Sequence, residues 1–281
     1  MRRRMLLTVT LAVFGLVQGY AQGGTKWEMP PHFVVHSIRI TGLDTISPQE
    51  QQEIKKSLIG RTFDGPELSF VVERVIQRHG FFKATAGEPQ TSVKPGKKGR
   101  PQPAEVAVEV HLGRRYKLAE VAFTGAKTFP SAQLRALLPL ATGDILDIDA
   151  IGIGLSAIRD LFAQRGYLDA VGAPDTQVDD ERGTVGLTID LDEGGQYRVG
   201  GVAIIAPKDV ADRLYAACPL KPGAVYNPAL LPGFFAANRA LLPPHWSRQS
   251  DFEVSQDSQT RIVVLRVSAC PDERSCPGKE Y

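Results

Sequence analysis

Three cysteines near the C-terminal end carry the most obvious chemistry of this sequence: Cys218, Cys270 and Cys276. In an oxidising compartment two of them can form a disulfide, and a bridge between Cys270 and Cys276 would close a small loop. Pairing of Cys218 with either of the others is equally allowed by counting, and one thiol is left over in every case. A zinc site would need a second pair of ligands, and no histidine lies near the Cys270 and Cys276 pair.

The other side chains that could catalyse a reaction or bind a metal lack the required arrangement. His32 and His36 are four residues apart, but they lie beside two prolines and in a strand-like run, so they would not share a helical face. The run Asp179-Asp180-Glu181 is typical of a hairpin turn. The chain has neither the Gly-x-Ser-x-Gly nor the HExxH motif. We therefore predict a protein that is not an enzyme and binds no cofactor and no metal.

The first residues have the pattern of a secretory signal peptide. Arg2-Arg3-Arg4 form a positive start, an apolar stretch covers 5–17, and small residues at 19 and 21 fit a signal peptidase site. A membrane-spanning helix needs ~20 apolar residues, and this stretch is shorter. We predict that residues 1–21 are a cleaved signal, with a retained membrane anchor as the alternative. No later segment is apolar enough to span a bilayer, so we expect no transmembrane segment after cleavage.

Charge excludes one class of partner. The chain has 33 basic and 31 acidic residues, and three of the basic ones lie in the predicted signal, so the remainder has a formal charge of −1. A near-neutral protein has no electrostatic basis for binding nucleic acid. About 260 residues remain, which is enough for two or three domains with their own cores.

A unit of about 80 residues recurs three times, and this repetition organises the sequence. Thr41-Gly42 and Thr124-Gly125 each follow a strand-like run, and they are 83 positions apart. Two further stretches match each other, and each ends in a tyrosine, Tyr116 in one and Tyr197 in the other. The pattern Gly-x-x-apolar-Asx recurs at corresponding positions of the three units, at 60–64, 143–147 and 223–227.

Each unit has the pattern strand, helix, helix, strand, strand. In the first unit Ser47, Pro48 and Glu50 predict the start of a helix through a capping box. The second helix has one continuous apolar face, made of Leu68, Val71, Val72, Val75 and Ile76. The last strand of the second unit alternates apolar and polar residues, which indicates a sheet with one packed and one solvated face.

These residues make the sequence similar to the POTRA domain, the periplasmic module of the BamA and TamA families of outer-membrane assembly proteins. The resemblance rests on the strand-plus-glycine entries, the Gly-x-x-apolar-Asx turns, the helix ends at 79–82 and 165–167, and the closing strands that lead to Tyr116 and Tyr197. It implies an α+β fold of tandem POTRA-like β-α-α-β-β units, each a three-stranded mixed sheet with two helices on one face. The expected domains are 33–113, 114–195 and, departing more from the pattern, 196–268, followed by a tail at 269–281.

The resemblance also implies a function. Family members with a transport role of their own carry a membrane β-barrel after these domains, and we expect none here because few residues follow 267. The chain would then be a non-enzymatic periplasmic POTRA array, peripheral to the outer membrane. Its expected partners are an outer-membrane β-barrel protein or unfolded outer-membrane clients.

The open edge of each sheet is where such a module would bind, because unpaired N–H and C=O groups of an edge strand can pair with an extended peptide, which is β-augmentation. In the family the second strand of the unit commonly lies at this edge. We predict binding at 84–93, 170–179 and 250–256, through Thr85, Thr91, Val93, Val171, Gln177, Val178, Phe252 and Val254. The Gly, Pro and acidic residues of these segments fit equally well an edge that is protected against aggregation.

Two other functions are alternatives to this one. An envelope or cell-division scaffold would use the repeats to bridge folded partners and would need a retained membrane anchor. A KH-like nucleic-acid module would need a Gly-x-x-Gly clamp between its helices, which none of the three units has.

Overall fold

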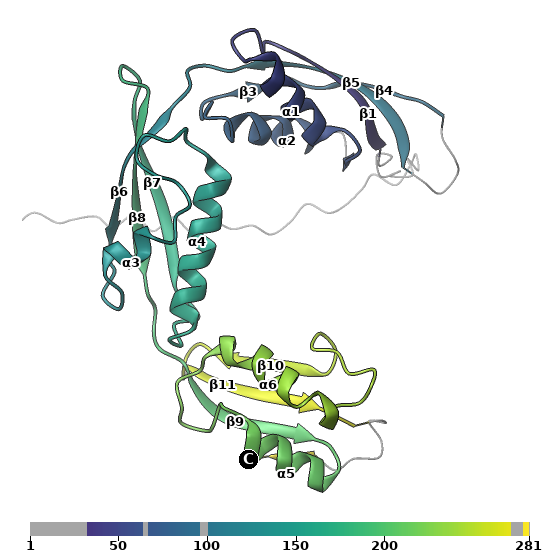
Figure 1. The fold of residues 1–281 in the computed structure, drawn as a ribbon, viewed down its shortest axis with the longest axis vertical. Coiled ribbons are helices and arrows are strands. Elements are labelled where there is room, and N and C mark those ends of the chain that lie inside the picture. Colours follow the sequence, from purple (N-terminus) through teal and green to yellow (C-terminus); the bar gives the residue numbers. More distant parts are fainter. Residues whose placement is uncertain (1–32, 64–66, 96–100, 271–277, 281) are drawn as a thin grey trace, which may run out of the picture.

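The computed structural model describes residues 33–63, 67–95, 101–270 and 278–280. They form three sheets in chain order, which we call the first unit (β1 to β5), the second unit (β6 to β8) and the third unit (β9 to β12). Figure 1 shows the three units along a curved path, with α2, α4 and α6 on its inner side. The predicted signal, residues 1–21, lies outside the described residues.

The first unit is a mixed sheet covered by two helices. Its central strand β5 pairs parallel with β1 on one side and antiparallel with the short strands β3 and β4 on the other, while β2 pairs with the start of β1. Its elements are β1 (Phe33–Thr41), α1 (Pro48–Leu58), β2 (Thr62–Phe63), α2 (Glu67–Gln77), β3 (Thr85–Ala86), β4 (Gln90–Val93) and β5 (Gln102–His111).

The predicted cap of α1 is confirmed for Ser47 and Pro48. The Ser47 hydroxyl accepts a hydrogen bond from the backbone N–H of Glu50, and Pro48 is the first helical residue. The Glu50 carboxylate itself is directed to His79 and Arg115, at the end of the unit. The predicted return bond of this carboxylate to the start of α1 is therefore replaced by contacts with the chain just after α2 and with the linker.

The second unit repeats this plan with a much shorter first helix. Central strand β8 pairs parallel with β6 and antiparallel with β7. Asp147 caps α4, since its carboxylate accepts the backbone N–H groups of Asp149 and Ala150. The elements are β6 (Lys117–Thr124), α3 (Ser131–Arg135), α4 (Ile148–Ala163), β7 (Val171–Asp179) and β8 (Thr184–Asp192).

The third unit has an additional strand. Central strand β11 pairs parallel with β9 and antiparallel with β10, and β12 pairs antiparallel with the free side of β9. Its elements are β9 (Arg198–Ile205), α5 (Lys208–Ala217), η1 (Pro228–Leu230), α6 (Leu231–Ala237), η2 (Arg239–Leu241), β10 (Phe252–Asp257), β11 (Ile262–Ser268) and β12 (Gly278–Glu280).

Each unit encloses its own hydrophobic core between its sheet and its helices. The predicted apolar face of α2 is part of the first core, with Val71 partly buried and the other four residues buried. Leu134 of α3 and Ile158 of α4 share the second core with Leu187 of β8, so both helices cover the same face of that sheet. The predicted fold class, tandem POTRA-like mixed sheets with their helices on one face, is confirmed.

Two details differ from the predicted three strands. In the first unit Gly87-Glu88-Pro89 splits the outer strand into β3 and β4, because a proline nitrogen has no hydrogen to donate to β5. In the third unit β12 adds a fourth strand, which no local pattern in the sequence indicated. Among the helices that the structure describes, none combines the length and the hydropathy that a membrane crossing requires.

Candidate functional site

Each unit ends its sheet, on the side opposite its first strand, with an edge strand that contains predicted binding residues. In the described part of the chain, β3 and β4 pair only with β5, β7 only with β8, and β10 only with β11. In β3 the Ala86 N–H donates to the Glu73 carboxylate at 2.8 Å. The other outward backbone groups of these strands make no strand pairing in this part of the chain and are available to an added strand. Thr85 lies in β3, Thr91 and Val93 in β4, Val171, Gln177 and Val178 in β7, and Phe252 and Val254 in β10.

The β4 edge is the most open of the three. Thr91 and Val93 pair with Val106 and Ala104, which are buried in the core, so both side chains are on the helix side of the sheet. They are nevertheless exposed, Val93 to 44 %. A strand added to β4 could therefore pair its backbone and also cover apolar surface.

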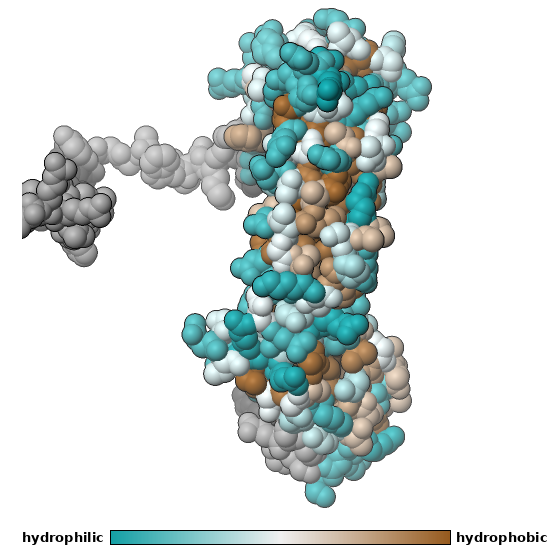
Figure 2. All heavy atoms as spheres, turned by 90° about the vertical axis from the view of Figure 1, so that its left-hand side faces the viewer, coloured by the Kyte–Doolittle hydropathy of each residue, from teal (hydrophilic) through white to brown (hydrophobic). Residues whose placement is uncertain are grey.

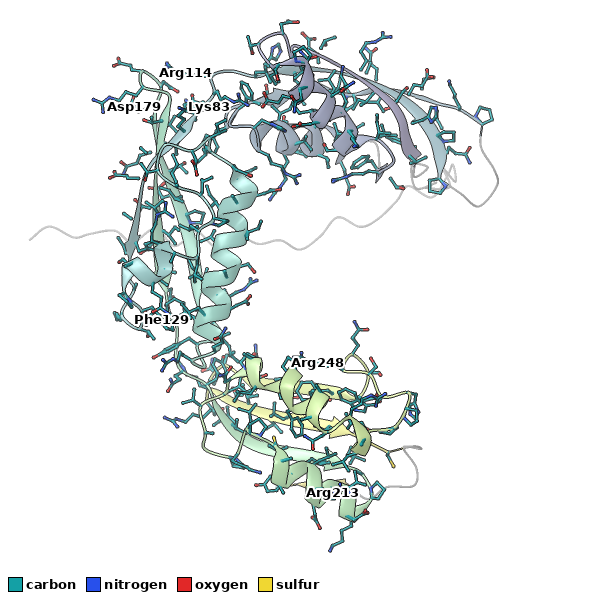
Figure 3. The ribbon with its side chains drawn as sticks, viewed as in Figure 1. Lys83, Arg114, Phe129, Asp179, Arg213 and Arg248 are labelled. Atoms are coloured by element: carbon teal, nitrogen blue, oxygen red, sulfur yellow. The ribbon has the colours of Figure 1, made fainter. Side chains whose placement is uncertain are left out.

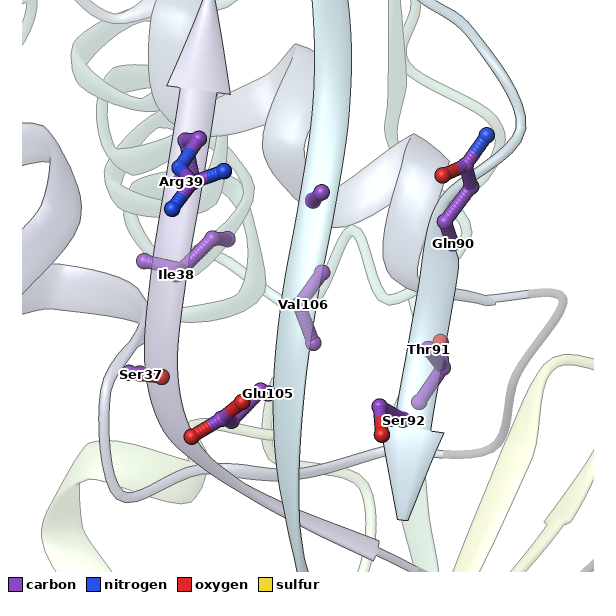
Figure 4. A pocket seen from close by; sticks show the side chains of 9 residues that line it. Ser37, Ile38, Arg39, Gln90, Thr91, Ser92, Glu105 and Val106 are labelled. Carbon is purple, nitrogen blue, oxygen red and sulfur yellow. The ribbon is translucent and has the colours of Figure 1, made fainter.

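A shallow pocket lies on the other face of the first sheet, across β1, β5 and β4 (Figure 4). It has a volume of about 460 Å³ and is lined by small and polar side chains, among them Ser37, Arg39, Gln90 and Glu105. A hydrogen bond from Lys94 lowers the pKa of Glu105, so this carboxylate is charged at neutral pH. The pocket adds space beside the β4 edge.

The β7 edge is partly blocked by its own sequence. Pro174 has no N–H to give to β8, so its nitrogen must point away from β8, and by alternation those of Thr176 and Val178 do too. Val171 and Gln177 are exposed, whereas Val178 is partly buried against the core. A groove of about 240 Å³ runs between β7 and α4, beside Val171.

The β10 edge is covered on its helix side at one end only. Phe252 packs partly into the core, with its ring centre 5.1 Å from that of Phe235 and with the Arg248 guanidinium above it. Val254 is 38 % exposed. Of the two predicted residues in β10, Val254 is therefore the one that an added strand would touch.

The junctions between units are built on one repeated hydrogen-bonding scheme. Gly80 and Gly166 follow the second helix of their units with positive φ, and their carbonyls accept the backbone N–H of Tyr116 and Tyr197. The tyrosine carbonyls in turn accept N–H groups of the next unit, those of Leu146 and Tyr226. Each linker is thereby clamped between the helix end behind it and the loop ahead of it.

The first junction, between the first and second units, adds charge to this scheme. Asp180 accepts hydrogen bonds from Lys83 at 2.8 Å and from the Tyr116 hydroxyl, and its backbone carbonyl accepts one from Arg114. Asp149 at the start of α4 pairs with Arg74 and Arg78. Figure 3 shows Lys83, Arg114 and Asp179 gathered where the two units meet.

These contacts shift the pKa values of the groups involved. The hydrogen bonds from Lys83 and Tyr116 lower the pKa of Asp180, and the bond to Asp180 raises the pKa of Lys83. The bond to Asp180, together with burial, raises the pKa of Tyr116. Asp180 was predicted only as a turn residue, and its partners are far away in the sequence.

The second junction, between the second and third units, is less charged. The Tyr197 hydroxyl donates to Asp169 at 2.8 Å, and the Gln196 side chain donates to the Arg165 carbonyl. The bond to Asp169 and burial raise the pKa of Tyr197. Among the described residues, the ion pairs that join two units all lie at the first junction.

No constellation for catalysis or metal binding appears in the part of the chain that the structure describes. It contains no group of three or more His, Cys, Asp or Glu side chains that could hold a metal. Cys218 is a buried free thiol whose pKa is raised by burial. Cys276 lies outside the described residues, so its pairing with Cys270 stays a prediction.

Comparison with known proteins identifies the repeated module. Residues 116–194, from the first junction tyrosine to just beyond β8, match the POTRA family, described as a surface antigen variable number repeat. This stretch is similar in sequence to a POTRA domain. The match covers the second unit, whose sheet order and junction contacts are described above.

Two further proteins are similar to more of the chain. A protein of Treponema pallidum named "Putative outer membrane protein assembly factor" is 27% identical over 183 residues, which are 60% of this chain and 22% of that protein. The chain thus spans about a fifth of the length of this curated relative. The crystal structure of Haemophilus influenzae BamA POTRA3-5 matches 84% of this chain and 96% of its own, with 18% identity and a TM-score of 0.57. That structure supports the fold across all three units.

Proposed function

We propose that this chain is a non-enzymatic periplasmic POTRA array that binds client or partner polypeptides during outer-membrane protein assembly. The three POTRA domains would be 33–113, 114–195 and 196–268. The observation that carries the proposal is that every unit ends in an edge strand whose outer side pairs with no other described strand. The relative named as an assembly factor supports the cellular role.

The energetics fit transient binding. A backbone hydrogen bond gives a net ~1 kcal/mol, so a client that pairs with four or five residues of an edge is held weakly. Exposed apolar residues at the edges, Val93, Val171 and Val254, would add contacts with the client. A chain with three such edges can hold one long extended client at several points, which raises the effective concentration at each.

Photo-crosslinking tests where the client binds. A photo-reactive residue is placed at Thr91, at Gln177, or at Asp160, which is exposed on α4 away from the edge. Each full chain is mixed with a urea-unfolded outer-membrane β-barrel protein as it is diluted into buffer. We expect crosslinks from the first two positions and few from Asp160. Equal crosslinking from all three would contradict edge pairing, and crosslinks to folded periplasmic proteins alone would favour an envelope scaffold.

A matched pair of variants tests the backbone itself. Thr176→Pro removes an outward N–H from β7, whereas Thr176→Val keeps that N–H and the strand propensity. Loss of crosslinking at Gln177 in the proline variant alone would support β-augmentation. Equal loss in both variants would mean that the side chain, and not the backbone, is recognised.

A further inference from the structure

The first strand of the second unit is also an open edge. The loop between α3 and α4 bonds only the beginning of β6: the Leu118 N–H donates to the Asp144 carbonyl at 2.9 Å, and the Gly143 N–H donates to the Leu118 carbonyl at 2.8 Å. From Glu120 to Thr124, β6 pairs with β8 alone within the described residues. This edge is on the opposite side of the sheet from β7.

The third unit shows what this edge can accept. Tyr116 and Tyr197 are equivalent residues of the junction scheme, and their spacing of 81 positions places Ala122–Thr124 of β6 at the same site as Ala203–Ile205 of β9. In β9 these three residues pair antiparallel with β12. The strand geometry of the fold therefore allows an added strand at this position, and β6 presents the same stretch without one.

The β6 edge also exposes more apolar surface than the equivalent strand β9. Val121 and Phe123 face the core but are only partly buried, whereas the equivalent Val202 and Ile204 of β9 are 2 % and 0 % exposed. The reason is the length of the covering helix, because α3 has 5 residues while α1 has 11 and α5 has 10. Figure 2 shows a hydrophobic band along the middle of the molecule, on the side where Figure 1 places β6 and α3.

We propose that the β6 edge is a second docking site, which takes an extended segment of a partner polypeptide. The segment pairs antiparallel with β6, as β12 does with β9, and places alternate aliphatic or aromatic side chains over Val121 and Phe123. The chain's own strand β12 is not this segment, since it already pairs with β9 and its sequence Gly-Lys-Glu has no apolar residue.

This site is separate from the second-strand edges of the proposed function. β7 carries Pro174 and Asp175, which limit pairing, while β6 has no proline and one charged residue between Leu118 and Thr124, Glu120. Both edges belong to one sheet, so the second unit could hold one segment on each side.

Hydrogen exchange followed by NMR tests this site. The probe is a nine-residue peptide that alternates valine with threonine and lysine, added to the full chain. We expect slowed exchange at the backbone amides of Val121 and Phe123 and affinity reduced at least ~10-fold by the pair Val121→Thr and Phe123→Thr. If that pair does not fold, Val121→Thr alone should reduce affinity ~3-fold.

The control variant changes β7, the opposite edge of the same sheet. Thr176→Pro should leave the exchange at Val121 and Phe123 unchanged, because it alters only the opposite edge. Protection at β7 with none at β6 would overturn this inference and leave the proposed function standing. Self-association through β6 in the absence of peptide, measured by sedimentation, would overturn the assignment to a partner polypeptide.

Discussion

The two junctions of this chain share one backbone scheme and differ in charge. At each, a glycine of positive φ ends the second helix and its carbonyl accepts the N–H of a tyrosine whose hydroxyl donates to an aspartate. At each, the second residue after that glycine, Phe82 or Leu168, packs into the core of the following unit. Among the residues that the structure describes, ion pairs between units lie at the first junction, among them those from Asp149 and Asp180 to Arg74, Arg78 and Lys83.

The shared contacts and the ion pairs therefore have different roles. The shared hydrogen bonds and the inserted apolar residue determine which parts of the linker contact each unit. They are present at both junctions, whereas the ion pairs are described at the first. The ion pairs at the first junction are partly exposed and change the strength of that contact more than its geometry. We therefore expect the first junction to respond to salt and acid and the second to respond mainly to packing.

The largest effect is expected from a side chain at the second junction glycine. A Cβ added at Gly166 would lie 2.9 Å from the Tyr197 carbonyl oxygen and 2.8 Å from Val225, at a φ of +82°. We predict that Gly166→Ala lowers the free energy of unfolding by about 2–3 kcal/mol. Thermal unfolding measures this, with Gly223→Ala as control, because Gly223 has positive φ and open space around it. Equal losses in the two variants would refute the junction contact.

The same change at the first junction should cost less. A Cβ at Gly80 would meet the movable Ile145 side chain at 2.5 Å, but the Tyr116 carbonyl oxygen only at 3.1 Å. We predict that Gly80→Ala lowers the free energy of unfolding by about 1–2 kcal/mol, measured in the same way. A loss larger than that of Gly166→Ala would contradict this predicted order.

The ion pairs at Asp149 should have a smaller, local effect. Asp149→Ala removes the partner of Arg74 and Arg78, which are partly exposed, so we predict a loss of about 1 kcal/mol or less. Spin labels at Lys56 and Arg159 should report a broader distance distribution between the first two units. Asp160→Ala, on the same helix, should leave that distribution unchanged. A sharp distribution in both variants would mean that these ion pairs do not hold the junction.

Salt should distinguish the two junctions without any mutation. Raising the ionic strength from about 0.05 M to about 0.5 M shortens the screening length from ~14 Å to ~4 Å and weakens exposed ion pairs. We predict a broader distance distribution across the first junction, between Lys56 and Arg159, and little change across the second, between Arg159 and Asp209. Equal broadening across both would contradict the comparison.

Acid should have the smallest effect, and its direction follows from Asp180. Its pKa is lowered in the folded chain, so its contribution is complete above the unfolded value of ~3.9 and is lost as the pH falls through the folded value. We predict that the first junction loosens below about pH 4 and that Asp180→Asn is already loose at pH 6. Small-angle scattering between pH 6 and pH 3 checks this, and a variant that stays as acid-sensitive as the parent chain would refute it.

The sequence predicted the fold where its signals are local. Ser47 and Pro48 start α1, and the apolar spacing in α2 gives the buried face, because caps and periodicity act within one helix. The junction tyrosines, which the repeat places at equivalent positions, are both almost fully buried.

What the sequence could not show depends on contacts between distant residues. The pair Arg78 and Asp149 and the pair Lys83 and Asp180 are 71 and 97 positions apart, and isolated surface charges carry no pattern that identifies a partner. The short α3, which leaves β6 partly uncovered, follows from tertiary packing as much as from propensity. The edge positions themselves followed from the resemblance to the POTRA domain, while their role in binding stays a prediction.

The most direct test of the account is hydrogen exchange, read by mass spectrometry, on the full chain with and without an unfolded outer-membrane protein. If the edges bind clients, exchange should slow in the peptides that contain β4, β7 and β10 and stay unchanged in those that contain α2 and α4. Protection confined to the helices, with the client bound, would contradict binding by strand addition.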